Sequence, residues 1–107
     1  MKLLTKDILK KLPPLYGTEE IPLEEKKVIV KFFGGSSASF YGIEFDPAEG
    51  LFWGWVNLGD REMAEFGYFS LPELQTIRFK PFGLPVERDL YWSSDTPMKD
   101  VLSGKIT

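Results

Sequence analysis

Three carboxylates come close together in the sequence, at Glu44, Asp46 and Glu49. Glu44 and Asp46 would share one face of a strand and Glu49 would lie in the adjoining turn, so their oxygens could hold a hard cation such as Mg²⁺. A metal-dependent nuclease of the familiar carboxylate type would also need a lysine on the next strand, and residues 51–53 supply none. A carboxylate-based hydrolase is therefore a distant alternative, and we expect no catalytic residue and no metal site.

Two other motifs have a chemical interpretation. Trp53 and Trp55 could stack on a sugar, but tryptophans at i and i+2 of a strand are typical of a core. The run Gly34-Gly35-Ser36-Ser37 lacks the lysine of a phosphate-binding loop and is typical of a hairpin connection.

The chain has no histidine and no cysteine, which removes the usual general base, the commonest metal ligands and any disulfide. We expect no cofactor, and the sequence does not favour an enzyme.

The composition is that of an ordinary globular protein. The 107 residues are 43% hydrophobic and 27% charged, which predicts a single domain over residues 1–107. No apolar run approaches the roughly 18 residues of a membrane span. Charges at Lys6 and Asp7 interrupt the apolar stretch that a signal peptide needs. We expect a soluble, cytoplasmic protein that does not contact a membrane.

The charge is unevenly distributed along the chain. The net charge is −3, but residues 32–76 contain seven acidic residues against Arg61 alone, a local net charge of −6. A protein that binds duplex DNA typically has a basic surface instead. The acidic middle of the chain therefore favours a protein partner over nucleic acid. The mixed run of acids and lysines at residues 24–27 predicts a solvated segment.

Capping patterns predict three short helices. Thr5 is a typical N-cap, and the apolar residues that follow it at helical spacing predict a helix that ends before Pro13. The run Ser70-Leu71-Pro72-Glu73 is a capping-box pattern, which predicts a helix to about Thr76. Thr96 and Pro97 predict the N-cap and first residue of a last helix through Leu102.

The remaining apolar segments predict strands. Residues 27–33, 39–46, 51–57 and 64–69 are rich in β-branched and aromatic residues and are separated by turn sequences. Residues 86–92 are compatible with a further strand. The sequence thus predicts an α+β fold, in which a small antiparallel β-meander of about four to five strands accompanies an N-terminal helix, a short helix after the meander and a short C-terminal helix.

The turns between the strands predict their register. A symmetric first hairpin places Asp46 opposite Gly50 and Gly42 opposite Gly54, and the second turn places Gly54 opposite Gly67. Directly opposed residues share a face of the sheet. The predicted core face therefore carries Tyr41, Ile43, Phe45, Leu51, Trp53, Trp55, Phe66 and Tyr68, and the other face carries the three glycines as a trough.

Two interpretations of this glycine trough are open. Glycine inside a strand often marks a close approach to the backbone. One of the protein's own helices, or its C-terminal segment, could lie in the trough. Otherwise the trough and its acidic rim would receive a partner, and the candidate interaction surface would be Phe40, Gly42, Glu44, Phe52, Gly54, Glu62, Glu65, Gly67 and Phe69. Glu87, Arg88 and Asp89 form a secondary candidate cluster, for which a surface ion-pair set is the simpler interpretation.

Several short blocks of sequence indicate a family. They include Leu12–Tyr16, Glu44–Pro47, Gly50–Gly54, Gly67–Leu71 and Gly83–Leu90. These blocks resemble the signature of a short bacterial family catalogued only as a domain of unknown function. The resemblance covers nearly the whole chain and implies an accessory role on plasmids or other mobile elements, but it implies no reaction and no catalytic residue.

The sequence leaves two classes of function. The first is a non-enzymatic interaction protein whose acidic middle binds a protein partner, for instance by imitating the charge of nucleic acid. The second is a module for single-stranded nucleic acid that stacks bases on sheet aromatics, with Lys27, Lys31, Arg78 or Lys80 beside them. The acidic charge disfavours the second class. The sequence predicts neither the partner nor the oligomeric state.

Overall fold

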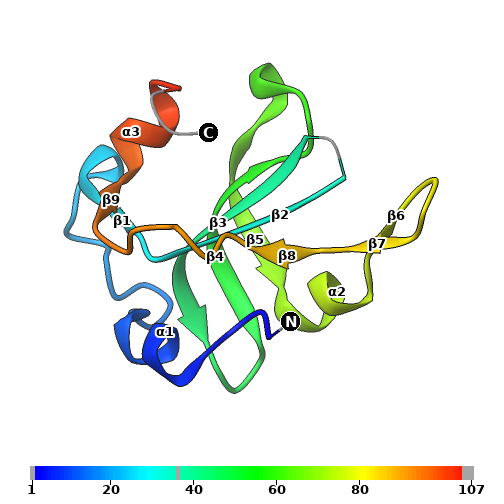
Figure 1. Cartoon of the computed structure of the whole chain (residues 1–107). Coiled ribbons are helices and arrows are strands. Elements are labelled where there is room, and N and C mark those ends of the chain that lie inside the picture. Colours follow the sequence, from blue (N-terminus) through cyan, green and yellow to red (C-terminus); the bar gives the residue numbers. More distant parts are fainter. Residues whose placement is uncertain (1, 36, 105–107) are drawn as a thin grey trace.

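A five-stranded antiparallel sheet is the centre of the fold (Figure 1). The structure, a computed structural model, describes residues 2–35 and 37–104. Strands β2 to β5 follow one another as hairpins, and the short β8 pairs with β2, so the sheet order is β5-β4-β3-β2-β8. The predicted α+β fold with an antiparallel meander is confirmed. The sheet consists of β2 (Val30–Gly34), β3 (Ala38–Asp46), β4 (Leu51–Asn57), β5 (Glu65–Ser70) and β8 (Glu87–Arg88).

Short helices and two small strand pairs surround this sheet. Thr5 and Ser70 are the N-caps of α1 and α2 as predicted, because their side chains accept from the backbone N–H of Ile8 and Glu73. None of the helices in the described ranges has the length and apolar character of a bilayer span. The surrounding elements are α1 (Lys6–Lys11), α2 (Leu71–Thr76), α3 (Met98–Leu102), the 3₁₀ turns η1 (Leu23–Glu25) and η2 (Arg61–Met63), and the pairs β1 (Lys27–Val28) with β9 (Thr96–Pro97) and β6 (Arg78–Phe79) with β7 (Leu84–Pro85).

Two predicted strands differ in the structure. The segment 27–33 is divided at Ile29, because β1 pairs with β9 whereas β2 pairs with β3. The segment 86–92 contributes only β8, after which the chain leaves the sheet and the indole Nε1 of Trp92 donates to the Val28 carbonyl at 2.9 Å. Thr96 lies in β9, and the N-cap of α3 is Pro97 instead.

The glycine alignment is confirmed, but a bulge shifts part of the predicted register. Gly42 is opposite Gly54, and Gly54 is opposite Gly67. One extra residue at Ile43 then shifts the pairing, so that Glu44 rather than Ile43 is opposite Trp53. The predicted pairing of Asp46 with Gly50 is therefore wrong, because Asp46 is opposite Leu51. Phe45 moves to the face of Phe52, and Glu44 moves to the face of Trp53.

Both faces of the sheet carry a core. The larger cluster fills the predicted trough, where Phe32 and Phe52 are fully buried and Leu74 of α2 and Ile8 of α1 pack against them. The protein's own helices thus cover the trough at Gly42 and Gly54, as in the first of the two interpretations above, whereas its end at Gly67 stays open. A smaller cluster on the other face packs α3 and the β1–β9 pair against the sheet. Figure 1 shows α3 next to this strand pair. Its members are Val28, Tyr41, Ile43, Met98 and Val101, with partly buried aromatics beside them.

Candidate functional site

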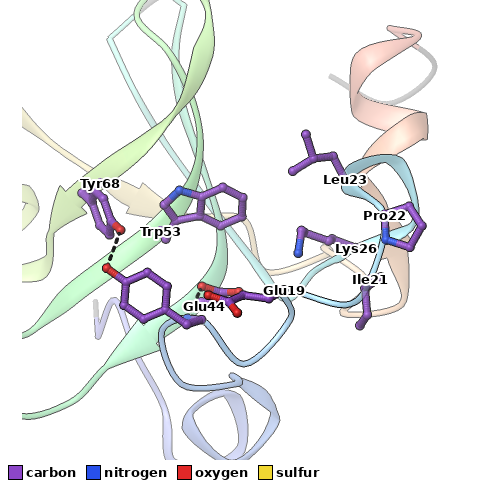
Figure 2. Close-up of a pocket in the computed structure, with 9 residues that line it drawn as sticks. Glu19, Ile21, Pro22, Leu23, Lys26, Glu44, Trp53 and Tyr68 are labelled. Atoms are coloured by element: carbon purple, nitrogen blue, oxygen red, sulfur yellow. Dashed lines mark hydrogen bonds between the residues drawn. The ribbon is translucent and has the colours of Figure 1, made fainter.

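A cavity of about 420 Å³ opens on the sheet face that carries Trp53. This volume is within the range of small-molecule sites, roughly 300 to 1,000 Å³. The three strands β3, β4 and β5 supply its floor, because Glu44, Trp53 and Tyr68 are directly opposed across them. Figure 2 shows the segment around Ile21 to Lys26 on the other side. The residues that line this hollow, which we call the Trp53 cavity, are Tyr16, Glu19, Ile21, Pro22, Leu23, Lys26, Glu44, Trp53 and Tyr68.

Glu44 anchors the loop that closes the cavity. The bulge at Ile43 places this side chain on the cavity face, where it is 5% exposed. One carboxylate oxygen accepts from the backbone N–H of Tyr16 at 2.9 Å. The other accepts from the backbone N–H of Thr18 at 3.1 Å and from the Thr18 hydroxyl. Three hydrogen bonds to one buried carboxylate therefore hold the loop against the sheet.

Lys26 is a buried cation at the wall of the cavity, with 4% exposure. Its Nζ donates to the Thr18 carbonyl, donates to Thr18 Oγ1 at 2.8 Å, and lies 5.6 Å from the centre of the Trp53 ring. The Thr18 hydroxyl thus links the ammonium of Lys26 to the carboxylate of Glu44, and the two charges balance. Residues 24–27 were predicted to be solvated, and for Lys26 that prediction is wrong because Thr18 supplies buried acceptors.

Two tyrosines close one end of the cavity. Tyr16 has a backbone φ of 67°, which is uncommon for a residue with a side chain and is held here by its hydrogen bond to Glu44. The hydroxyl oxygens of Tyr16 and Tyr68 are 3.2 Å apart and share a hydrogen bond. The dashed line at Tyr68 in Figure 2 marks this hydrogen bond. This hydrogen bond is the main reason that the pKa of Tyr68 is raised, and the charge of Glu44 adds to it.

We expect Tyr16→Phe to lower the pKa of Tyr68 toward that of an ordinary tyrosine. A raised pKa means that the folded state favours the neutral phenol, so this stabilisation is complete below a pH of about 10 and is lost as the pH rises through the folded-state pKa. A titration of ¹³C-labelled tyrosine followed by NMR would measure the change. Tyr41, whose pKa is raised by burial, is the internal control and should not respond. An unchanged Tyr68 titration would contradict the role of the hydroxyl pair.

Most of the predicted interaction surface is buried. Phe40 is 6% exposed, Phe52 is fully buried and Phe69 is 8% exposed, and Gly42 and Gly54 lie in the same core. The prediction of an open surface at these five residues is corrected, because α1 and α2 cover that face. Glu44 is also buried, although on the opposite face. The members that stay at the surface are Glu62, Glu65 and Gly67, in the β4–β5 hairpin and β5.

The three carboxylates of the first motif do not come together. Glu44 is bound to the loop as described, and Asp46 Oδ1 accepts from the backbone N–H of Ala48 at 2.9 Å in the turn. Over residues 2–35 and 37–104, no group of three acidic side chains lies close enough to hold a metal ion. Within the described residues, Glu44, Asp46 and Glu49 therefore do not form the carboxylate cluster that a metal-dependent hydrolase would need.

The secondary cluster lies at the other edge of the sheet. Glu87 and Arg88 form β8, and Arg88 donates to the Lys2 carbonyl, which ties the N-terminal segment to the sheet. The backbone N–H of Asp89 donates to the Lys31 carbonyl at 2.9 Å, and its Oδ1 accepts from the N–H of Tyr91. These contacts hold the N-terminal segment and the chain after β8 against this edge of the sheet.

Sequence reasoning missed the loop side of the cavity. Tyr16, Thr18 and Lys26 lie in a segment that carries no strand or helix pattern, so nothing assigned them a face. Two signals were present. The bulky Tyr16 precedes Gly17 in a turn region, and the basic pair Lys26-Lys27 lies at the start of the first strand, where alternation turns one of the two inward.

The fold and the cavity define a small α+β domain whose antiparallel sheet carries a ligand-sized hollow on one face. The chain belongs to the family described as Protein of unknown function (DUF2958), whose family model matches residues 3–103. The resemblance to a family of unknown function is thereby confirmed. No curated protein and no solved structure matches the chain.

Proposed function

We propose that this protein is a non-enzymatic interaction protein that binds a basic segment of a protein partner at one edge of its sheet. An accessory role on a bacterial mobile element, which the resemblance implies, belongs to the same proposal. The surface consists of exposed residues of the β4–β5 hairpin and of β5. We call it the acidic edge, and it comprises Leu58, Asp60, Glu62, Met63, Glu65 and Tyr68.

The open edge of β5 is the observation that carries this proposal. Within the described residues, β5 pairs with β4 and with no other strand. The N–H of Leu71 donates to the Gly50 carbonyl at 2.8 Å, and hydrogen-bonded pairs alternate along an antiparallel ladder. The backbone groups of Phe66 and Tyr68 therefore face away from β4. An extended segment of a partner can pair with such an edge.

Exposed apolar side chains at the acidic edge would supply contact area. Leu58 is 73% exposed, Met63 is 75% exposed and Tyr68 is 51% exposed. Together with Asp60 and Glu65 they border a hollow of about 450 Å³. Apolar groups that are rimmed by charged residues typically mark a protein interface. This combination supports a partner that buries these side chains.

The charge of the acidic edge favours a basic partner. Asp60, Glu62 and Glu65 are all exposed acids. Arg61, the basic residue of this hairpin, donates from Nη2 to the Leu102 carbonyl at 2.9 Å, which directs its charge toward α3. The negative potential along β5 would therefore speed the encounter with a positively charged segment and exclude acidic ones.

Binding of single-stranded nucleic acid stays a prediction, and two of the four basic residues that it needs already have partners within the protein. Lys31, one of the four basic residues that the stacking platform needed, is 7% exposed and lies 5.6 Å from the Tyr41 ring centre. Lys27 forms an ion pair with Asp95 at 3.3 Å. Neither lysine extends over the exposed part of the sheet.

Neutralising the acidic edge is expected to weaken partner binding about tenfold or more, because encounter and register depend on its charge. The variant is Asp60→Asn, Glu62→Gln, Glu65→Gln. The asparagine that replaces Asp60 would still cap η2, since Asp60 acts there through one side-chain oxygen that accepts from the N–H of Glu62. The measurement is capture of proteins from nuclease-treated bacterial lysate, followed by affinity determination with the purified partner.

A charge-matched variant is the control for this experiment. Glu20→Gln, Glu24→Gln, Glu49→Gln removes three exposed acids from other parts of the surface and should keep full affinity. Equal affinity of both triple variants would contradict the acidic edge as the binding surface. If proteins are captured from untreated lysate but not from nuclease-treated lysate, this would contradict a direct protein partner and favour nucleic acid.

A further inference from the structure

We propose that the Trp53 cavity binds a small aromatic ligand that carries an oxygen acceptor, in the form of an aryl amide or an aryl carboxylate. The ligand ring would pack between Trp53, Tyr68 and the apolar rim, and its oxygen would accept a hydrogen bond from Lys26. This inference goes beyond the proposed interaction with a protein partner. The two surfaces differ, although Tyr68 borders both hollows.

The donor in the cavity is the ammonium group of Lys26. An ammonium has three N–H donors, and Thr18 accepts two of them. Within residues 2–35 and 37–104, no carboxylate lies within 4.0 Å of Nζ. The side chain is buried, and Figure 2 shows its nitrogen on the side of the cavity where Glu19, Glu44 and Trp53 lie. A buried charged donor is best satisfied by an acceptor, and the cavity is the place where one can enter.

The aromatic walls are fixed before any ligand arrives. Trp53 stacks on Phe66, with ring centres 5.2 Å apart and an angle of 7° between the planes. Tyr68 is held by Tyr16, whose own backbone is held in its unusual conformation by Glu44. Rigid walls reduce the entropy that is lost on binding. The cavity is therefore pre-formed, as small-molecule sites usually are.

The rim of the cavity is apolar and exposed. Ile21 is 42% exposed and Leu23 is 48% exposed, with Pro22 between them. A planar ring that enters the cavity would cover part of this surface and remove it from water. The ring, rather than the polar group, would then supply most of the contact area.

The position over the Trp53 ring, where a cationic ligand would bind, is already taken by a cation. Aromatic rings often hold cations, but Lys26 already occupies the position 5.6 Å from the Trp53 ring centre. Both oxygens of the Glu44 carboxylate accept hydrogen bonds from the loop, and Lys26 balances its charge through Thr18. A second cation would be repelled by the first. A neutral acceptor such as an amide meets no such cost, whereas a carboxylate would gain from Lys26 but would also face the carboxylates of Glu19 and Glu44 in the same lining.

Three indole probes that differ in one group test the proposal on the intact protein. They are indole-3-acetamide, indole-3-acetate and tryptamine, which carry a neutral amide, a carboxylate and an ammonium. We expect at least one of the first two to bind about tenfold more tightly than tryptamine, because a hydrogen bond to a charged donor is worth about that factor. NMR shifts of the Trp53 indole N–H report binding, and the Trp92 N–H, which donates to Val28, is the reference.

Two variants assign the effect to the cavity. Lys26→Met keeps an apolar stem and should reduce the affinity of the preferred probe about tenfold. Leu23→Ser changes the exposed rim without touching the buried hydrogen bonds and should weaken binding as well, so the test holds even if Lys26→Met fails to fold. Leu84→Ser, at a residue of β7 that is 54% exposed and lies outside the cavity, is the matched control.

The proposal is overturned if no probe shifts the Trp53 signal, if tryptamine binds as tightly as the other two, or if Leu23→Ser and Leu84→Ser behave alike. These measurements need no protein partner. A failure here would leave the acidic edge untouched, and a failure of the capture experiment would leave the cavity untouched.

Discussion

Gly54→Ala is expected to lower the free energy of unfolding by about 3 kcal/mol, because the new methyl group has no space. A Cβ at this position would lie 1.8 Å from the backbone carbonyl oxygen of Tyr41. Backbone of the central strands cannot move aside without breaking the ladder between β3 and β4. Among the substitutions considered for this protein, we expect this one to have the largest effect on stability per added atom.

The other two aligned glycines provide a graded series. At Gly42 a Cβ would meet side-chain atoms, with Val30 Cγ1 at 2.9 Å, and side chains can shift, so we expect an intermediate loss of about 1 to 2 kcal/mol. At Gly67 nothing lies within 4 Å of the added atom. Gly67→Ala should therefore change stability by less than about 1 kcal/mol.

Urea denaturation followed by tryptophan fluorescence would measure all three variants under the same conditions. The expected order of stability is Gly67→Ala, then Gly42→Ala, then Gly54→Ala. Equal losses at Gly54 and Gly67 would show that the spacing between β3 and β4 adapts, and would contradict the close approach as the reason for the glycine.

The same glycines show how much of the fold was predictable. The alignment of Gly54 with Gly67 followed from the second turn, and the caps at Thr5 and Ser70 followed from side-chain chemistry next to the helix. The alignment of Gly42 with Gly54 is correct although the predicted pairing at the first turn is one residue off, because the bulge at Ile43 cancels that shift. The bulge at Ile43 was not predictable, because inserting one residue into a ladder leaves no mark in an apolar strand. It nevertheless decides which face Phe45 and Glu44 occupy.

The cavity was harder to predict, because it is built by contacts between residues that are far apart in the sequence. Trp53 and Tyr68 were placed correctly on one face, since they are neighbours across a regular ladder. The partners of Glu44 lie 26 and 28 residues away in an irregular loop, and no periodicity connects them. Burial of Lys26 likewise depends on Thr18, eight residues earlier. Sequence patterns assign faces of regular elements, whereas this site is built by a loop that folds onto a face.

Removing the carboxylate of Glu44 is the second substitution for which we expect a large effect. Glu44→Ala would leave the N–H groups of Tyr16 and Thr18 without their acceptor, and would leave Lys26 buried without the charge that balances it. Loss of one member of a buried charged network typically costs about 3 kcal/mol or more. Thermal and urea denaturation would measure the loss. Glu49→Ala, an exposed acid of the same hairpin, is the control and should change stability by less than about 0.5 kcal/mol.

A double-mutant cycle with Lys26→Met distinguishes a charge network from simple loss of packing. If Thr18 links the two charges as its hydrogen bonds indicate, removing both should cost less than the sum of the single losses, by about 1 kcal/mol or more. Strictly additive losses would mean that Glu44 and Lys26 act independently, each only through its own contacts with the loop. Coupled losses would identify the Glu44, Thr18 and Lys26 contacts as one unit that holds the loop and thereby the shape of the Trp53 cavity.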